Sequence, residues 1–244
     1  MSDNYEAYID KINIRYDKIK LIDESEHRVK YLVRDTETNK LFVMGILKCG
    51  DKKIYDKIIK IDNMNILKYY HVFNLKSGEL IVIEEYLEGA KNLNQYIDGP
   101  INKNGFEDCL LQICDAMIYL NSLKKPILYN NIFPENILVD KDNVVKIMNF
   151  ERANDKGAIT DDIKSFGELI NNTNDYYKKR YRSLINACHN KYGTFTEVQK
   201  GIHSSRRVIG IKYTVFIMIS VILFIFLRLL WVYARLNNRI LKYF

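Results

Sequence analysis

The first third of the chain alternates apolar and polar residues with the period of two that is typical of β-strands. Three such segments are separated by turn residues at 23–26 and 36–39, which predicts an antiparallel meander of three strands. A short helix and two further strands are predicted to follow. The meander strands span 18–24, 27–35 and 40–48, the helix spans 51–62, and the last two strands span 66–75 and 79–86.

The middle of the chain changes to the spacing of a helix that faces a core. After a break at Asp98, Gly99 and Pro100, apolar residues recur every three or four positions up to Leu123. Two apolar runs then flank the turn residues 140–143, which predicts a β-hairpin. Two closing helices are predicted over 181–201. The residues at helical spacing are Phe106, Leu110, Ile113, Met117 and Leu120.

The chain ends with a long apolar segment. Between Val208 and Tyr233 the charged residues are Lys212 and Arg228 alone, so the segment is long enough to cross a hydrocarbon core of ~30 Å. A soluble core helix is the alternative, but no amphipathic period supports it. Arginine and aromatic residues flank the segment as interface anchors do. We therefore predict one transmembrane helix over 208–233 and a short basic tail over 234–244.

Composition indicates one globular domain before this segment. The 244 residues are 48% apolar, which argues against disorder and allows a core of useful size. Seven of the 37 Lys and Arg residues follow Ser204, where no acidic residue occurs, so 30 basic residues balance 30 acidic residues in the rest of the chain. A neutral domain argues against nucleic-acid binding, which needs a basic face.

The cysteines predict reduced thiols and a cytosolic domain. No two of them form a Cys-x-x-Cys pair, and no histidine lies at the spacing of a zinc site. The N-terminal residues contain no basic segment followed by an apolar run, so no secretory signal is predicted. We therefore expect a single-pass protein of the cytoplasmic membrane with its N-terminal domain in the cytoplasm. The cysteines are Cys49, Cys109, Cys114 and Cys188.

Several motifs that carry chemistry lie in the second half of the chain. Residues 134–138 read Pro-Glu-Asn-Ile-Leu, a predicted hairpin follows, and 149–151 read Asn-Phe-Glu. Residues 162–167 read Asp-Ile-Lys-Ser-Phe-Gly, and in the first half of the chain residues 84–89 read Glu-Glu-Tyr-Leu-Glu-Gly. In this order they resemble the hinge, the catalytic loop, the metal loop and the following helix of Ser/Thr protein kinases. The resemblance is closest in style to the membrane-anchored kinases of Gram-positive bacteria and covers roughly 12–203.

The resemblance implies an α+β fold of two kinase-like lobes, in which the C-terminal lobe is truncated. The N-terminal lobe and hinge are expected in 1–100 and the shortened C-terminal lobe in 101–204. Tyr129 and Phe150 stand where the family stacks an internal aromatic spine, so the contacts between lobes are expected to remain. Asp162 is expected to brace the backbone of the catalytic loop.

The two loops lack the family's acidic residues. The family's His-Arg-Asp has become Tyr129, Asn130 and Asn131, and its Asp-Phe-Gly has become Asn149, Phe150 and Glu151. The amide of Asn131 has no basic lone pair with which to accept the proton of a substrate hydroxyl. Asn149 offers a neutral carbonyl where Mg²⁺ prefers a carboxylate, so no metal site is predicted.

The nucleotide-binding residues of the N-terminal lobe are also replaced. The resemblance places Gly45 where the family has its phosphate-binding lysine, and no glycine stands at the three positions of the phosphate loop. Lys48 could substitute only through a bulge, because it points to the other face of the strand. Glu84 is expected to line the back of the pocket. Glu85 and Asn136 remain as remnants of a nucleotide site, so ATP binding is predicted to be weak or absent, with no cofactor.

Two hypotheses about function follow from the resemblance. The first is a catalytically inactive kinase-like domain, not an enzyme, that is tethered to the membrane and serves a protein partner as a scaffold or regulatory module. The alternative is a divergent membrane-anchored Ser/Thr kinase with residual phosphotransfer by displaced residues such as Lys48, Glu135 or Glu151. A third interpretation is a subunit similar to the pseudokinase component of type VII secretion machines. The eleven residues after Tyr233 argue against it, because they are too few for an extracytoplasmic domain.

Overall fold

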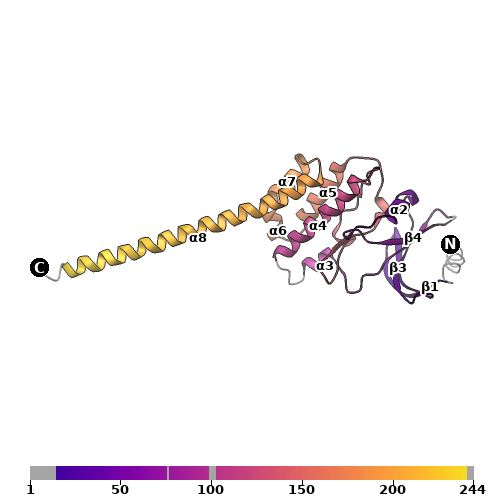
Figure 1. The fold of residues 1–244 in the computed structure, drawn as a ribbon, viewed down its shortest axis with the longest axis horizontal. Helices are drawn as coiled ribbons and strands as arrows, with labels where there is room; N and C mark the ends of the chain where they lie inside the picture. The colour runs from indigo at the N-terminus through magenta and orange to yellow at the C-terminus, as the bar shows by residue number, and fades with distance from the viewer. Residues whose placement is uncertain (1–14, 76, 99–102, 241–244) are drawn as a thin grey trace. The chain divides into compact units, whose positions relative to one another are not determined.

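The structure is a computed structural model that describes residues 15–75, 77–98 and 103–240 (Figure 1). The chain divides into two compact units, Met1–Gln199 and Lys200–Phe244. The first unit contains all the strands and the helices before α8. The lobe boundary predicted at residues 100 and 101 lies outside the described residues.

The first half of the Met1–Gln199 unit is a five-stranded antiparallel sheet, which confirms the predicted meander and the two strands after it. The strand order is β1-β2-β3-β5-β4, so β5 extends the meander. Helix α2 follows β3 and packs against β4, and Asp51 caps its N-terminus by accepting a hydrogen bond from Lys53 N at 2.8 Å. The bounds are β1 Tyr16–Glu24, β2 Arg28–Asp35, β3 Leu41–Leu47, α2 Lys52–Ile58, β4 Tyr69–Asn74 and β5 Leu80–Glu85.

Both faces of the central strands are buried: one packs into an apolar cluster, and the other borders a pocket. One face carries an apolar cluster that includes Val33, Met44 and Ile83, each fully buried. Because side chains alternate along a strand, the intervening residues point to the opposite face. That opposite face carries Lys30 of β2 and Glu84 of β5, and it borders the pocket described below.

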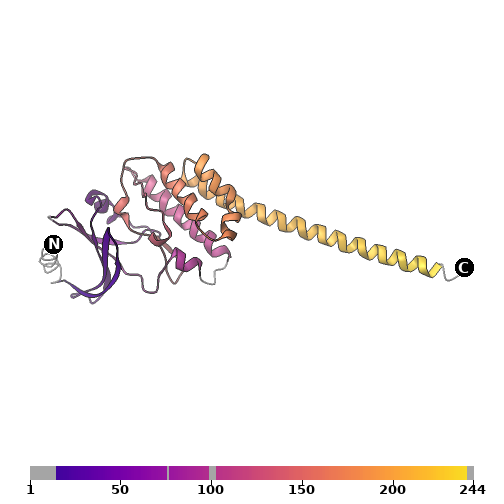
Figure 2. The same cartoon turned by 180° about the vertical axis from the view of Figure 1, so that it is seen from behind.

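Helices and a small sheet form the second half of this unit. Strands β6, β7 and β8 pair in this order, and β7 and β8 form the predicted hairpin. The five residues that recur at helical spacing, from Phe106 to Leu120, are fully buried on α4, as predicted. Figure 1 shows α4 to α7 gathered on one side of this unit and strands β1, β3 and β4 on the other, and Figure 2 shows the same arrangement from behind. The bounds are β6 Lys91–Asn92, α3 Leu93–Ile97, α4 Lys103–Ser122, η1 Pro134–Asn136, β7 Ile137–Val139, β8 Val145–Ile147, η2 Phe150–Arg152, α5 Ile159–Asn171, α6 Asp175–Arg180 and α7 Arg182–Asn190.

A column of aromatic rings joins the two halves. Tyr55 of α2 contacts Tyr69 of β4, and Tyr69 contacts Phe150 of η2, with ring centroids 5.5 and 5.9 Å apart. Phe150 in turn contacts Tyr129, at 5.1 Å. All four side chains are essentially inaccessible to solvent. The sheet is therefore held against the hairpin by contacts that include the aromatic residues expected from the sequence.

Helix α8, Phe195–Ile240, begins in the first unit and continues through the second. Among the residues that the structure describes, no helix is both long and apolar enough to cross a membrane, so the span predicted over 208–233 is not found. That segment is instead the continuation of a 46-residue helix, in which Ser220 and Arg228 interrupt the apolar side chains. The predicted tail continues α8 up to Ile240, and 241–244 lie outside the described residues.

Candidate functional site

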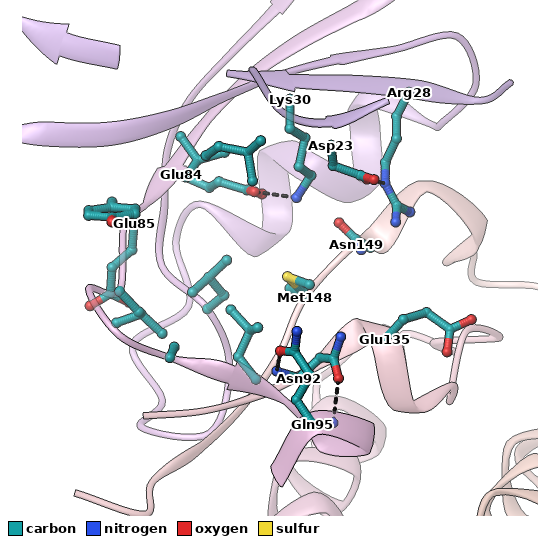
Figure 3. A pocket seen from close by; sticks show the side chains of 17 residues that line it. Asp23, Arg28, Lys30, Glu84, Glu85, Asn92, Gln95, Glu135, Met148 and Asn149 are labelled. Carbon is teal, nitrogen blue, oxygen red and sulfur yellow. Dashed lines mark hydrogen bonds and ion pairs between the residues drawn. The ribbon is translucent and has the colours of Figure 1, made fainter. Parts of the chain in front are cut away.

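A pocket of about 380 Å³ lies between the five-stranded sheet and the β7–β8 hairpin (Figure 3). Val43 of β3 contributes apolar surface from the sheet, and Leu138 and Met148 contribute it from the hairpin side. The segment that connects β5 to α3 closes one side. There Glu85 forms an ion pair with Lys146 of β8 at 3.4 Å. The pocket therefore contains an apolar slot that could accept a flat, largely apolar group.

The deep end of the pocket contains a buried ion pair. Lys30 Nζ donates a hydrogen bond to Glu84 Oε1, and Figure 3 shows the two side chains converging from β2 and β5. Lys30 is 4% exposed and Glu84 is 3% exposed. A buried charge is costly unless it is paired, so each of these groups makes the burial of the other tolerable.

Arg28 brings a second cation to the same pocket from the start of β2. Its Nε donates to Asp23 Oδ2 at 2.8 Å, and its Nη1 donates to Glu151 Oε1 at 2.8 Å. Partial burial acts to lower the pKa of Arg28, but the hydrogen bond to Asp23 and the charge of Glu151 outweigh it, so the pKa is raised. The guanidinium stays charged while it links the sheet to the loop after β8.

Asp162 of α5 fixes the loop that corresponds to the catalytic loop. Its two carboxylate oxygens accept hydrogen bonds from Tyr129 N at 2.8 Å and Asn130 N at 2.7 Å. Burial raises the pKa of Asp162, and these two backbone hydrogen bonds counteract the rise. Asn130 has a φ of 53°, a left-handed conformation that asparagine adopts more readily than most residues. The bracing role expected for Asp162 is therefore visible in the geometry.

Three asparagines connect the two loops in a ring of hydrogen bonds. Asn131 Nδ2 donates to Asn149 O at 2.7 Å, Asn149 Nδ2 donates to Asn136 Oδ1 at 2.7 Å, and Asn136 Nδ2 donates to Asn131 O at 3.2 Å. All three side chains are at most 3% exposed. The amide nitrogens are thus committed to the loops. Asn149 Oδ1, by contrast, is buried without a hydrogen-bond partner among the described residues.

This unsatisfied oxygen is the feature that best fits a metal ion. Asn149 lines the pocket together with Glu135, and a buried carbonyl without a partner is normally explained by a water or an ion. No group of three or more His, Cys, Asp or Glu residues able to hold a metal ion occurs in the described part of the chain. A Mg²⁺ ion that arrived with a ligand could therefore be held by Asn149 and Glu135, with fewer charged oxygens than Mg²⁺ usually has.

The structure brings most of the residues singled out in the sequence to this pocket or beside it. Asn149, Glu85 and Glu135 line it, Asn131 and Asn136 belong to the amide ring, and Glu151 binds Arg28. Gly45 lies on the sheet face that borders the pocket. Lys48 is exposed and does not line the pocket.

Sequence reasoning missed Lys30 and Arg28, the two cations of the pocket. A signal for Lys30 was present in the sequence. With the turn at 36–39 the two strands around it pair so that Lys30 faces Gly45, the register that the structure has. Cross-strand partners share a face of the sheet, so a lysine opposite Gly45 could have been placed in the pocket.

Comparison with known proteins agrees with this geometry. An Aurora kinase of Candida glabrata is 30% identical over 114 residues, which are 47% of this chain and 31% of that protein. An Aurora kinase of Saccharomyces cerevisiae is 30% identical over 109 residues, 43% of this chain and 29% of that protein. The serine/threonine-protein kinase tousled-like 2 of Mus musculus is 29% identical over 93 residues, 37% of this chain and 12% of that protein. The chain thus matches less than a third of the length of these relatives.

These matches correct one interpretation of the sequence. The replaced loop residues suggested a protein that is not an enzyme, and this is wrong, because these three relatives are named as kinases. That interpretation considered only the replaced positions, and it left out the two cations and the unsatisfied oxygen of this pocket. The family model described as protein kinase domain matches residues 31–166, which is more than half of the chain. The match includes every residue that lines the pocket except those on β1 and at the start of β2. The chain therefore belongs to the protein kinase domain family.

Proposed function

We propose that this chain is a divergent protein kinase that binds ATP in the pocket and transfers the terminal phosphoryl group to a serine or threonine hydroxyl of a protein. The observation that supports the proposal is the combination of an apolar slot with two cations, Lys30 and Arg28, in one pocket. A flat base suits the slot, and phosphate oxygens suit ammonium and guanidinium groups.

The transfer is expected to be slow. The substrate oxygen forms a bond to the γ-phosphorus, the bond from that phosphorus to the β–γ bridging oxygen breaks, and ADP leaves. Asn131 cannot accept the hydroxyl proton, and a positioned base typically contributes ~10²- to 10⁴-fold in rate. In this proposal the hydroxyl proton goes to the carboxylate of Glu135, which lines the pocket. Positioning and electrostatic stabilisation supply the rest of the acceleration.

A second hollow gives the protein substrate an approach to this carboxylate. It has a volume of about 440 Å³ and shares Arg28 and Glu135 with the pocket. Asn131 and Phe133 also line it, and the Phe133 side chain is 44% exposed. A side-chain hydroxyl that entered this hollow would therefore meet the catalytic-loop segment and Glu135 together.

The test is transfer of label from γ-labelled ATP by the full chain, with Mg²⁺ or Mn²⁺ and a mixture of serine and threonine peptides. Label should accumulate slowly in peptide or in the chain itself. Glu135→Gln should reduce the rate, and Lys48→Ala, which changes an exposed lysine outside the pocket, should not. The proposal is wrong if label stays at the level of a protein-free control when ATP saturates the pocket.

We further propose that the chain acts at a membrane, with a protein partner there. The support is α8, in which every large apolar side chain from Phe216 to Leu229 is at least 51% exposed. A helix that is apolar on all sides is normally covered by lipid or protein. The full chain should stay with membranes in alkaline carbonate, and Phe224→Asp with Ile222→Asp should release it. Tyr176→Asp, at an exposed position of α6, is the control, and release of the unchanged chain would contradict the proposal.

A further inference from the structure

One lysine lines the described part of the pocket, and it comes from a different strand than the resemblance predicts. The phosphate-binding lysine of the family corresponds to Gly45 on β3, whereas Lys30 belongs to β2. Lys30 and Gly45 are direct partners in the β2–β3 ladder. Partners across antiparallel strands project from the same face of the sheet, so Lys30 enters the pocket from the position next to Gly45.

The absence of a side chain at Gly45 makes room for Lys30. A Cβ atom at Gly45 would lie 3.0 Å from Val82 Cγ2, which is closer than real Cβ atoms normally come, and 3.9 Å from Lys30 Cε. A side chain at position 45 would therefore push against Val82 and lie in contact with Lys30. Of these two paired positions, this chain carries a lysine on β2 and a glycine on β3.

The other cations near the pocket are committed elsewhere. Lys68 Nζ donates to Ile61 O at 2.9 Å, and Lys146 is paired with Glu85. Arg28 is held by two carboxylates, those of Asp23 and Glu151. Lys68 and Lys146 do not line the pocket, and two of the donors of Arg28 are already occupied by these carboxylates.

Lys30 differs from these two lysines because it lines the pocket, and the hydrogen bond to Glu84 uses one of the three donors of its ammonium group. Glu84 Oε1 accepts from Lys30 Nζ at the deep end of the pocket. The Lys30 side chain is 6% exposed and the Glu84 side chain is 3% exposed, so neither group can rely on water to stabilise its charge. A phosphate oxygen beside Lys30 would supply the negative charge that Glu84 supplies without a ligand.

We propose that Lys30 of β2 is the residue that binds the nucleotide phosphates, in the space that Gly45 leaves on β3, and that Glu84 is the counter-ion that holds Lys30 until a nucleotide arrives. This inference rests on the proposed function, because it assigns a role within the same ATP site. It also predicts that Glu84 competes with phosphate for the ammonium group.

The experiment compares the affinities of the full chain for ATP with Mg²⁺ and for adenosine, by titration calorimetry. Adenosine occupies the apolar slot alone, so it reports on the slot independently of Lys30. The test variant combines Lys30→Met with Glu84→Gln, because removing Lys30 alone would leave Glu84 buried and unpaired. Lys48→Met is the matched control, and the melting curve of each variant shows whether it is folded.

The double variant should bind ATP about ten- to a hundredfold more weakly, the effect of losing one charge-assisted hydrogen bond, while adenosine affinity stays unchanged. Glu84→Gln alone should tighten ATP binding, because it removes the competitor for Lys30. Unchanged ATP affinity in a folded double variant would overturn the role of Lys30 and leave the proposed function standing. A chain that binds neither ATP nor adenosine would overturn both proposals, and equal losses for the two ligands would show that Lys30 supports the slot instead of the phosphates.

Moving the lysine gives an independent check. Lys30→Gly combined with Gly45→Lys and Val82→Ala transfers the side chain to β3 and provides the space that it needs there. ATP affinity should return to within about tenfold of the unchanged chain, that is, to within about 1.4 kcal/mol. If the relocated lysine fails to restore ATP binding in a folded protein that still binds adenosine, a lysine in this shared space is not what binds the phosphates.

Discussion

Arg28 of β2 and Glu151 of η2, 123 residues apart in the chain, are joined by a hydrogen-bonded ion pair of 2.8 Å that ties the five-stranded sheet to the loop after β8. The Glu151 side chain is 7% exposed, and its second oxygen, Oε2, is buried without a hydrogen-bond partner among the described residues. The pair is a fixed contact between the sheet and this loop at the edge of the pocket.

Replacing Arg28 should therefore destabilise the fold. Arg28→Leu leaves the Glu151 carboxylate buried without its cation, and we expect the free energy of unfolding to fall by about 1.5–3 kcal/mol, the range for hydrogen bonds to charged groups. Urea denaturation measures the change. Arg34→Leu, an exposed arginine on the same strand, should change the stability by no more than about 0.5 kcal/mol. Equal effects of the two variants would show that the ion pair contributes nothing specific.

Asn131→Asp should increase the rate of phosphoryl transfer. The substitution supplies a basic carboxylate at the position where the family has its proton acceptor, and a positioned base contributes ~10²-fold or more. It also removes the hydrogen bond from Asn131 Nδ2 to Asn149 O, so some stability should be lost. Label transfer from γ-labelled ATP measures the rate, and Asn190→Asp on α7 is the control. A rate that does not rise in a folded variant would show that another step limits the reaction.

Asp35 should make stability depend on pH in the acid range. A hydrogen bond from Thr38 N lowers the pKa of Asp35, and contacts with Arg15 and Glu37 N lower it further. An acid whose pKa is lower in the folded state adds stability above its unfolded pKa of about 3.9, and this stability is lost as the pH falls through the folded pKa. The stability difference between the unchanged chain and Asp35→Asn should therefore be largest near pH 7 and shrink below about pH 4. Asp17→Asn, at an exposed position of β1, is the matched control.

The four cysteines should differ sharply in reactivity. Burial raises the pKa of Cys109 and of Cys188 to about 12, and it raises the pKa of Cys114 well above its usual value, so their thiolate populations at neutral pH are very small. Cys49 is exposed and borders the hollow beside Glu135. Iodoacetamide at pH 7.5, followed by mass spectrometry, should modify Cys49 first in the folded chain and all four in urea. Early modification of Cys114 would contradict the described packing of α4.

Local pattern was a sound guide to the elements of this protein. The alternation along β2 and β3 predicted both strands, and the spacing of residues from Phe106 to Leu120 predicted the buried side of α4. These signals are local because the period of a strand or a helix is visible within one segment. The apolar segment near the C-terminus was predicted to span a membrane, and the structure describes it instead as the continuation of α8.

The chemistry of the pocket was harder to predict. The residue type at one position of a motif does not show which charged side chains line the pocket in the folded chain. The glycine at position 45 and the amides at 131 and 149 led to the mistaken conclusion that the protein is not an enzyme. The charge of a site depends on every side chain that reaches it. Two neighbouring strands can each bring a lysine to the same face of a sheet. Lys30 does this through its register with Gly45.

The sequence by itself determined the strands, the core-facing helix, the hairpin and the resemblance to kinases, since each depends on residues close together in the chain or on their order. Only the tertiary structure decided which charges meet: Lys30 pairs with Glu84 across 54 residues, and Arg28 reaches Glu151 across 123. Such pairs depend on strand register and on how the sheet packs against the hairpin. Those depend on the whole core, including the aromatic column from Tyr55 to Tyr129, and no single segment of the sequence contains that information.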